Sequence, residues 1–331
     1  MTAAGAGMTA TGAADAVAAG LPVLVLTGPT GAGKSEWATR LAEVAPIEIV
    51  SVDSALVYRG LDIGSAKPSA ALRAHIAHHL IDICEPTQNY SAGRFVADAL
   101  QCIRAIHARR RVPLLVGGTM LYLRALLRGL APLPQASEQV RRELDERAAR
   151  AGWSALHAEL ARHDPLAAAR INTADAQRIQ RALEVWYMTG RPISQWQRDT
   201  SSPLAAACVC SWALAPADRG MLHARIGQRF GEMMAAGFLE EVRTLRRRGD
   251  LRPSHSCVRA VGYRQLWAHL DCEYGLDEAV QRGIAATRQL AKRQLTWMRS
   301  ESALQCLDPQ HPRAQASWIR DASQILRELG F

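Results

Sequence analysis

A glycine-rich loop near the start of the chain constrains the fold more than any other segment. It follows a short apolar run at residues 23–26, which is typical of a buried strand, and a helical pattern begins after it. The loop reads GPTGAGKS, which matches the spacing G-x-x-x-x-G-K-[ST] in the strand–loop–helix setting that this pattern requires. Its residues are Gly28, Pro29, Thr30, Gly31, Ala32, Gly33, Lys34 and Ser35.

The chemistry of this loop suits a ligand with at least two phosphates. Backbone N–H groups can converge on an anion because glycine permits tight turns, and the following helix adds the positive end of its dipole. Lys34 supplies a positive charge, and the hydroxyl of Ser35 can bind Mg²⁺. We therefore predict a diphosphate site with Mg²⁺ as its cofactor; a plain tight turn is the alternative.

Strand and helix patterns alternate over the first part of the chain. Apolar runs at 47–52, 79–83 and 112–116 predict three further strands. This alternation predicts an α/β fold of the P-loop NTPase type, in which helices flank a parallel sheet. The carboxyl ends of its strands would bring the phosphate loop close to Asp53 and to Gly117–Thr119.

Four segments are expected along the chain. Residues 1–20 are rich in Ala, Gly and Thr and predict a disordered tail, and residues 21–128 form the α/β core. Residues 129–206 carry helical patterns and predict an inserted all-helical subdomain. A strand pattern at 207–215 predicts that residues 207–331 return to the core and continue as helices.

The charge balance favours a polyanionic partner. The chain has 40 basic and 31 acidic residues, with twelve basic and seven acidic between positions 240 and 299. Arginine runs are also common on solvated surfaces, which is the alternative. The seven cysteines include no C-x-x-C pair and favour free thiols in a reducing compartment. Apolar runs are too short for a membrane span, so we expect a cytoplasmic protein.

Asp53 follows the second predicted strand, where an acid can accept a proton or bind Mg²⁺ through water. The alternative is that Asp53 is the N-cap of the next helix. Hydrolytic P-loop enzymes place an Asp after an apolar strand to hold Mg²⁺, but Gly117-Gly118-Thr119 follows the strand at 112–116. This pattern predicts a transferase in which the diphosphate is the leaving group or the anchor.

Seven stretches carry a more specific signal. They are GPTGAGKS at 28–35, SVDSALVYRGLDIGSAKP at 51–68, LIDICEPTQNYSAGRF at 80–95, PLLVGGTMLYLRALLRGLAPLP at 113–134, DAQRIQRALEV at 175–185, RAVGYRQLW at 259–267 and TRQLAKRQLTWMR at 287–299. Together they resemble the bacterial tRNA dimethylallyltransferase (tRNA isopentenyltransferase) family. The resemblance implies transfer of the dimethylallyl group from dimethylallyl diphosphate to N6 of the adenosine immediately 3′ of the anticodon, in tRNAs reading codons that begin with U.

The resemblance also implies roles for individual residues. Asp53 would accept the proton of the adenine amine, Thr119 would help to place the base, and Lys34 and Arg225 would bind the diphosphate. The helical insertion would close over the anticodon stem-loop of the tRNA. The implied tRNA contacts are Asp53, Ser54, Ala55, Leu56, Thr119, Arg141, Gln177, Arg178, Ile179, Gln180, Arg181, Arg259, Ala260, Val261, Gly262, Tyr263, Arg264, Lys292, Arg293, Gln294, Trp297 and Arg299.

The sequence departs from the family pattern in small ways, and two other functions can be weighed against the transferase. Ser35 stands where relatives often have Thr, and the zinc finger of some eukaryotic relatives is absent, so no metal beyond Mg²⁺ is implied. A small-molecule P-loop kinase would consume ATP without RNA, against which the basic charge and the missing γ-phosphate machinery argue. A non-catalytic RNA-binding module with a vestigial loop is disfavoured by the intact Gly33, Lys34 and Ser35. We expect a monomer.

Overall fold

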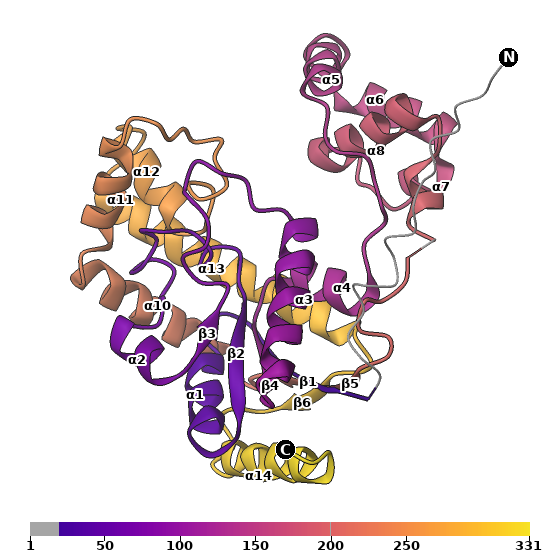
Figure 1. Ribbon diagram of the computed structural model, residues 1–331. Helices are drawn as coiled ribbons and strands as arrows, with labels where there is room; N and C mark the ends of the chain where they lie inside the picture. The colour runs from indigo at the N-terminus through magenta and orange to yellow at the C-terminus, as the bar shows by residue number, and fades with distance from the viewer. Residues whose placement is uncertain (1–19, 199) are drawn as a thin grey trace, which may run out of the picture. The chain divides into compact units, whose positions relative to one another are not determined.

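Six parallel strands form the sheet of the larger of two compact units (Figure 1). The computed structural model describes residues 20–198 and 200–331, so the tail expected at 1–20 lies outside the described residues except for Gly20. The strands are β1 (Pro22–Thr27), β2 (Ile47–Val52), β3 (His78–His79), β4 (Val112–Gly117), β5 (Cys208–Leu214) and β6 (Gln305–Leu307). They lie in the order β3-β2-β4-β1-β5-β6, and each neighbouring pair is parallel. The predicted parallel α/β fold is confirmed.

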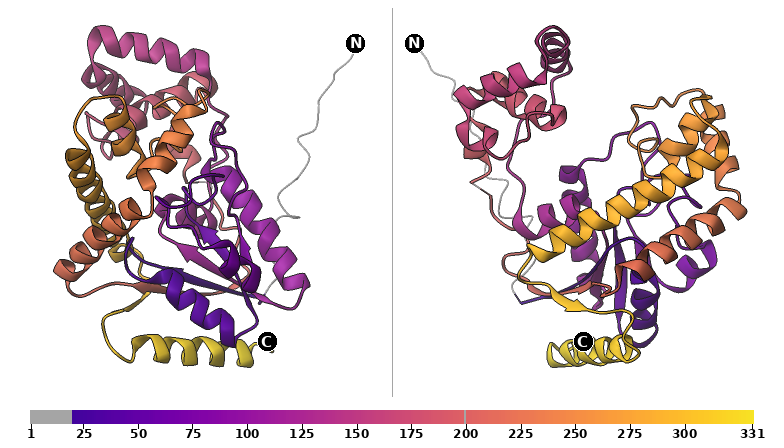
Figure 2. Two further views of the ribbon diagram at one scale, coloured as in Figure 1. Left: turned by 90° about the vertical axis from the view of Figure 1, so that its left-hand side faces the viewer. Right: turned by 180° about the vertical axis from the view of Figure 1, so that it is seen from behind.

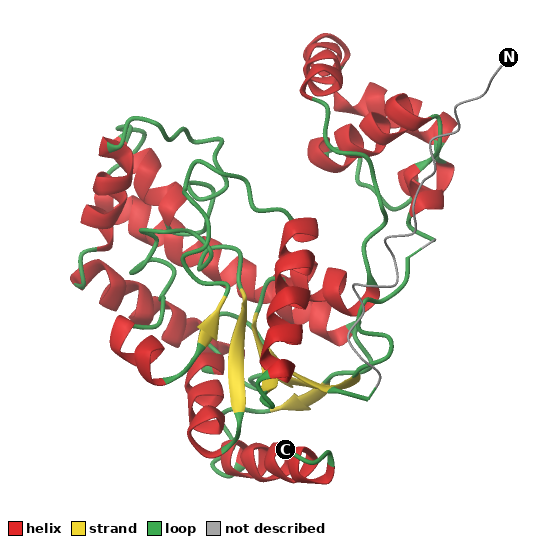
Figure 3. Cartoon of the chain, viewed as in Figure 1, coloured by secondary structure: helices red, strands yellow, loops and turns green. Residues whose placement is uncertain are grey.

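The helices of this unit lie on both faces of the sheet (Figures 2 and 3). They are α1 (Lys34–Val44), α2 (Ala70–His75), α3 (Ala92–Ala108), α4 (Met120–Arg128), α10 (Arg219–Ala235), α11 (Phe238–Arg247), α12 (Tyr263–Leu270), α13 (Leu276–Arg299) and α14 (Ala314–Glu328). None of the helices in the described part of the chain combines the length and the apolar character that crossing a membrane requires. All seven cysteines lie at described positions and are free thiols.

Alternation along the strands gives the sheet two apolar faces. In β1, Leu24 and Leu26 enter one core with α1 and α14, whereas Val23 and Val25 enter the other with α3 and α4. Both sets of side chains are fully buried, as expected for a parallel sheet that helices cover on both sides. The strand ends that follow this core are therefore held at fixed positions.

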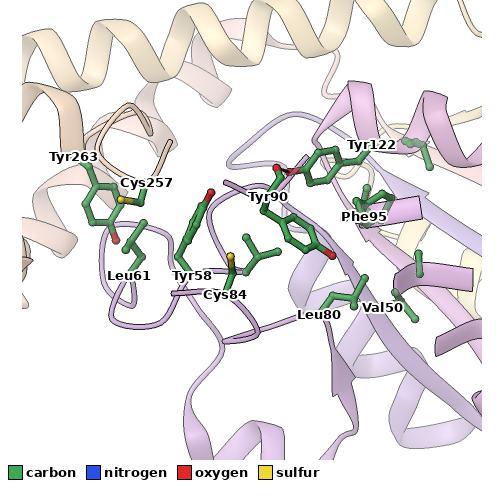
Figure 4. Close-up of a cluster of buried hydrophobic side chains, with 14 of the residues drawn as sticks. Val50, Tyr58, Leu61, Leu80, Cys84, Tyr90, Phe95, Tyr122, Cys257 and Tyr263 are labelled. Atoms are coloured by element: carbon green, nitrogen blue, oxygen red, sulfur yellow. Dashed lines mark hydrogen bonds between the residues drawn. The ribbon is translucent and has the colours of Figure 1, made fainter. Parts of the chain in front are cut away.

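The second core continues beyond the sheet and supports the segment after β2 (Figure 4). Phe95 of α3 stacks on Tyr122 of α4 with ring centroids 4.5 Å apart. The hydroxyl of Tyr122 donates a hydrogen bond of 2.9 Å to the backbone oxygen of Tyr90. Tyr58 and Tyr263, which are far apart in the sequence, are buried in the same cluster. The cluster thus fixes the chain just after Asp53 against α12.

The strand predicted at 79–83 is wrong beyond its first residue. β3 ends at His79, because Leu80 and Asp82 have φ angles of 61° and 56°, which an extended strand does not allow. The carboxylate of Asp82 accepts hydrogen bonds from Lys67 at 2.5 Å and from Arg73 at 2.7 Å. Ion pairs with the preceding segment and backbone hydrogen bonds from residues 82–84 to Leu56 and Val57 therefore hold the chain here, in place of a longer β3.

Residues 128–202 form the second compact unit, close to the insertion expected at 129–206. Its helices are α5 (Glu138–Ala151), α6 (Trp153–His163), α7 (Pro165–Ala168), α8 (Ala176–Thr189) and α9 (Ile193–Trp196). Leu144, Leu160 and Leu183 are among the residues of its own apolar core. The unit therefore has the internal packing of a separate subdomain.

Glu241 of α11 holds the loop at 62–64 against α12. Its carboxylate accepts hydrogen bonds from the backbone N–H groups of Asp62 (2.9 Å), Ile63 (2.7 Å) and Gly64 (3.1 Å), and from the hydroxyl of Tyr263 (2.6 Å). Burial raises the pKa of Tyr263, and the neighbouring carboxylate raises it further, so the phenol stays protonated and donates. One side chain thus satisfies four donors from two segments.

We expect Glu241→Gln to lower the free energy of unfolding by about 2–4 kcal/mol, because the amide nitrogen cannot accept and leaves donors unpaired. Urea denaturation followed by circular dichroism measures the change. Glu240→Gln is the matched control, since Glu240 is exposed and pairs with Arg243 and Arg247 at the surface. Equal stability of the two variants would contradict the role of Glu241.

Candidate active site

The predicted phosphate loop connects β1 to α1. Gly33 caps the helix with left-handed backbone angles, φ 92° and ψ 11°, which glycine adopts without strain. The ammonium group of Lys34 donates to the backbone oxygens of Gly28 at 3.0 Å and Pro29 at 2.8 Å. Ser35 is exposed in the first turn of α1. The loop therefore presents an ammonium group and the positive end of a helix at the carboxyl edge of the sheet.

Helix α10 brings two arginines to this loop. A Cβ placed on Gly31 would lie 3.3 Å from Ile226 Cγ1, and one placed on Gly33 would lie 3.9 Å from a guanidinium nitrogen of Arg225. Arg229, one turn further along α10, interacts electrostatically with Arg225 and with Asp53. No role was predicted for Arg229 from the sequence, although its spacing of four from Arg225 was the available signal.

Lys34 is the group whose pKa the site shifts most clearly. Burial lowers its pKa to about 8, Asp53 opposes this shift, and Arg229 adds to it. The three charged groups therefore influence one another although they come from α1, the end of β2 and α10. Such interacting charges are typical of a site that binds an anion next to a proton-accepting group.

Asp53 and Thr119 lie at the carboxyl ends of two adjacent strands, β2 and β4. One carboxylate oxygen of Asp53 accepts from the backbone N–H of Ala55 at 2.8 Å and of Leu56 at 3.4 Å. It therefore caps a turn rather than the helix that the alternative for this residue supposed, since residues 54–57 form turns. The hydroxyl of Thr119 accepts from the N–H of Ser54 at 3.0 Å. Thr119 thus stabilises the turn that contains Asp53.

Gln294 connects the phosphate loop to the segment after β4. It is buried on α13, with 6% of its surface exposed. Its side-chain oxygen accepts from the N–H of Thr30 at 2.9 Å, and its side-chain nitrogen donates to the oxygen of Gly118 at 2.8 Å. The resemblance placed Gln294 among the tRNA contacts, and the sequence offered no signal for these two bonds.

The other implied tRNA contacts of the larger unit differ in exposure. Ser54, Arg259, Arg264, Lys292, Arg293 and Arg299 are exposed. Asp53, Ala55, Leu56, Thr119, Ala260, Val261 and Trp297 are partly buried. Gly262 and Tyr263 are buried, and the Tyr263 hydroxyl is bonded to Glu241. The exposed and the partly buried residues are therefore accessible to a large ligand, whereas the buried Tyr263 supports the local backbone.

The tRNA contacts that the resemblance implies in the helical unit also differ in exposure. Gln177 and Arg178 are exposed on α8. Arg141 and Arg181 both donate to Glu184, which is fully buried. Ile179 is fully buried in the apolar core, and Gln180 donates to Asp145 at 2.7 Å. Arg141 and Arg181 therefore balance a buried carboxylate, and Gln177 and Arg178 form the accessible part of this set.

The arginines around the end of α11 are paired with acids. Arg243 and Arg247 contact Glu240, Arg246 contacts Asp271, and Arg248 contacts Asp250. All four ion pairs lie at the exposed surface. A solvated surface, the alternative explanation for arginine runs, therefore accounts for these arginines.

A hollow of about 370 Å³ lies between α10 and α13 and has a basic rim. Leu222, Ala291 and Leu295 form its apolar part. Its rim carries Arg219, His223, Arg288, Lys292 and Arg299. Leu222 also lies 3.5 Å from a Cβ placed on Gly31, so the hollow shares a wall with the phosphate loop.

The donor set fits Mg²⁺ bound together with a diphosphate. Within residues 20–198 and 200–331 there is no group of three His, Cys, Asp or Glu side chains arranged to hold a metal. Mg²⁺, however, commonly takes one or two protein oxygens and completes its shell with substrate phosphates and water. The exposed hydroxyl of Ser35, beside the loop, is an oxygen of this kind.

Known proteins that are similar to this chain in sequence or in fold have related names. The IPP transferase family model matches residues 56–301. A tRNA dimethylallyltransferase of Alkalilimnicola ehrlichii is 55% identical over 293 residues, covering 88% of this chain and 92% of the relative. The crystal structure of a Bacillus halodurans tRNA isopentenylpyrophosphate transferase superposes with a TM-score of 0.68 at 33% identity, over 93% of this chain and 97% of the other. A eukaryotic dimethylallyltransferase acting on tRNA gives 0.75 at 25% identity, over 92% and 77% of the two chains. This chain belongs to the IPP transferase family.

Proposed function

We propose that this chain is a tRNA dimethylallyltransferase. It transfers the dimethylallyl group of dimethylallyl diphosphate to N6 of the adenosine immediately 3′ of the anticodon, position 37, in tRNAs that read codons beginning with U. The products are N6-dimethylallyladenosine and diphosphate. The names of its relatives support this class of reaction. The observation that carries the proposal is that the phosphate loop with Lys34 and the turn with Asp53 both follow strands at the carboxyl edge of one parallel sheet, with Arg225 of α10 beside the loop.

The chemistry of each group fits a displacement at carbon. The lone pair on N6 of adenine attacks C1 of the donor, the C1–O bond breaks, and the diphosphate leaves with the bonding electrons. This amine is a poor nucleophile because its lone pair is delocalised into the ring, so removal of its proton by Asp53 is required. Lys34 and Arg225 neutralise the charge that grows on the leaving diphosphate.

We also propose Mg²⁺ as the cofactor, held by Ser35 and the diphosphate. Bound there, it would supply further positive charge to the leaving group. The chain's own contribution is the ammonium of Lys34 and the turn that fixes Asp53, which Thr119 holds through the N–H of Ser54. The loop needs no γ-phosphate machinery for this reaction, which agrees with Gly117-Gly118-Thr119 at the end of β4.

The RNA partner is the anticodon stem-loop of a tRNA, whose target base must leave the stack to reach the edge of the sheet. The exposed Arg259, Lys292 and Arg299 are available to phosphates, so the affinity for RNA should fall as the salt concentration rises. The dimethylallyl diphosphate, the monomeric state and a cytoplasmic location belong to this proposal as well.

Radiolabelled dimethylallyl diphosphate, Mg²⁺ and unmodified tRNA test the function directly. We expect label in the tRNA, and none when the adenosine 3′ of the anticodon is replaced by guanosine. A parallel reaction with ATP and no RNA tests the kinase alternative. Consumption of ATP without labelling of RNA would overturn the proposal.

A further inference from the structure

Gln294 uses both ends of its side-chain amide to connect two segments of the site. The oxygen accepts from Thr30 of the phosphate loop, and the nitrogen donates to Gly118, the residue before Thr119. The bridge is tight, because a Cβ placed on Gly118 would lie 2.3 Å from that nitrogen and 3.0 Å from the backbone oxygen of Gly28. A buried amide with both ends bonded is fixed in one orientation.

The bridge continues to the turn that carries the carboxylate. Thr119 donates its N–H to the oxygen of Val52 at 3.2 Å, and its hydroxyl accepts from the N–H of Ser54 at 3.0 Å. Val52 and Ser54 flank Asp53 in the sequence. A continuous path of hydrogen bonds therefore runs from the phosphate loop through Gln294 and the segment at 118–119 to the two neighbours of Asp53.

We propose that Gln294 is a positioning residue that sets the distance between the diphosphate and the proton-accepting carboxylate. The inference rests on the proposed function and gives Gln294 a role other than the tRNA contact implied by the resemblance, because both ends of its side-chain amide are bonded within the protein. A displacement reaction needs its nucleophile and leaving group in line, and an error of about 1 Å can cost about 10²-fold in rate. The pairing of β1 with β4 ends at Thr27 and Gly117, and beyond that point Gln294 of α13 bonds to both of the segments that follow these strands.

Gln294→Met tests the proposal, because methionine has a similar length and makes neither hydrogen bond. We expect the single-turnover rate constant, with enzyme, donor and tRNA saturating, to fall about 10²-fold. The dissociation constant for tRNA should stay as in the wild type. The rate constant is informative because a variant that is only less stable has a smaller fraction of active enzyme. Such a variant shows a smaller amplitude of the single-turnover reaction but an unchanged rate constant. Gln281→Met, at an exposed position of the same helix, is the control.

Gly118→Ala provides a second variant if Gln294→Met does not fold. Its added methyl group would displace the Gln294 amide, so the same fall in rate constant is expected, and the two changes together should cost less than the sum of their separate effects. An unchanged rate constant, a loss of amplitude alone, or weaker tRNA binding with an unchanged rate constant would each overturn the inference. A wild-type enzyme that labels no tRNA would instead refute the proposed function.

Discussion

Asp53→Asn should lower the rate of dimethylallyl transfer by about 10²–10⁴-fold, the usual contribution of a general base. Asparagine keeps an oxygen that can accept from the N–H groups of Ala55 and Leu56, so the turn is retained while the proton acceptor is lost. Alanine at this position would remove both functions and leave their effects unseparated. The measurement is the single-turnover rate with labelled donor, together with the dissociation constant for tRNA, which should not change.

Asp308→Asn is a matched control for this prediction. Asp308 follows β6, and one of its carboxylate oxygens accepts from the N–H two residues later, as in Asp53. The same change of charge at the same kind of turn should leave the transfer rate unaltered. Near-normal turnover of Asp53→Asn would remove this carboxylate from the reaction.

Lys34→Met should lower kcat/KM for dimethylallyl diphosphate by about 10²–10³-fold, as for other single groups that stabilise a developing oxyanion. Because the pKa of Lys34 is lowered to about 8, the free wild-type enzyme loses this charge as the pH rises above 8. The wild-type kcat/KM for the donor should therefore decline above that pH, whereas the low value of Lys34→Met should not decline further. Steady-state kinetics between pH 7 and about 9.5 measure both effects.

One further substitution tests the charge of Lys34, and another is a control at a different lysine. Lys34→Arg keeps a positive charge throughout this pH range, so the decline above pH 8 should disappear. Lys292→Met removes a lysine that is exposed on α13 and should change the KM for tRNA but not for the donor. An alkaline decline that persists in Lys34→Met would assign it to another group.

Local patterns predicted much of the fold because each depends on neighbouring residues. The apolar run and the glycine spacing located the phosphate loop, and the alternation of strand and helix patterns predicted the parallel sheet. The prediction of a strand at 79–83 was wrong because Leu80 and Asp82 have left-handed φ angles, and because the chain there bonds to Lys67 and to the backbone of Leu56 and Val57, which lie elsewhere in the sequence. β6 was not predicted, since its three residues gain their conformation only by pairing with β5, whereas α14 lies in the region expected to continue as helices.

The sequence by itself determined that the chain has a phosphate-binding loop, an acid after the second strand and an α/β core, since these features follow from spacing along one segment. The contributions of Arg229, Glu241 and Gln294 became visible only in the tertiary structure. Each lies far along the sequence from the segment that it contacts, and a hydrogen bond or a Coulomb interaction depends on distances in space. Helices α10 and α13 bring Arg229 and Gln294 to the carboxyl edge of the sheet, where Lys34 and Asp53 lie, and α11 brings Glu241 to the loop at 62–64.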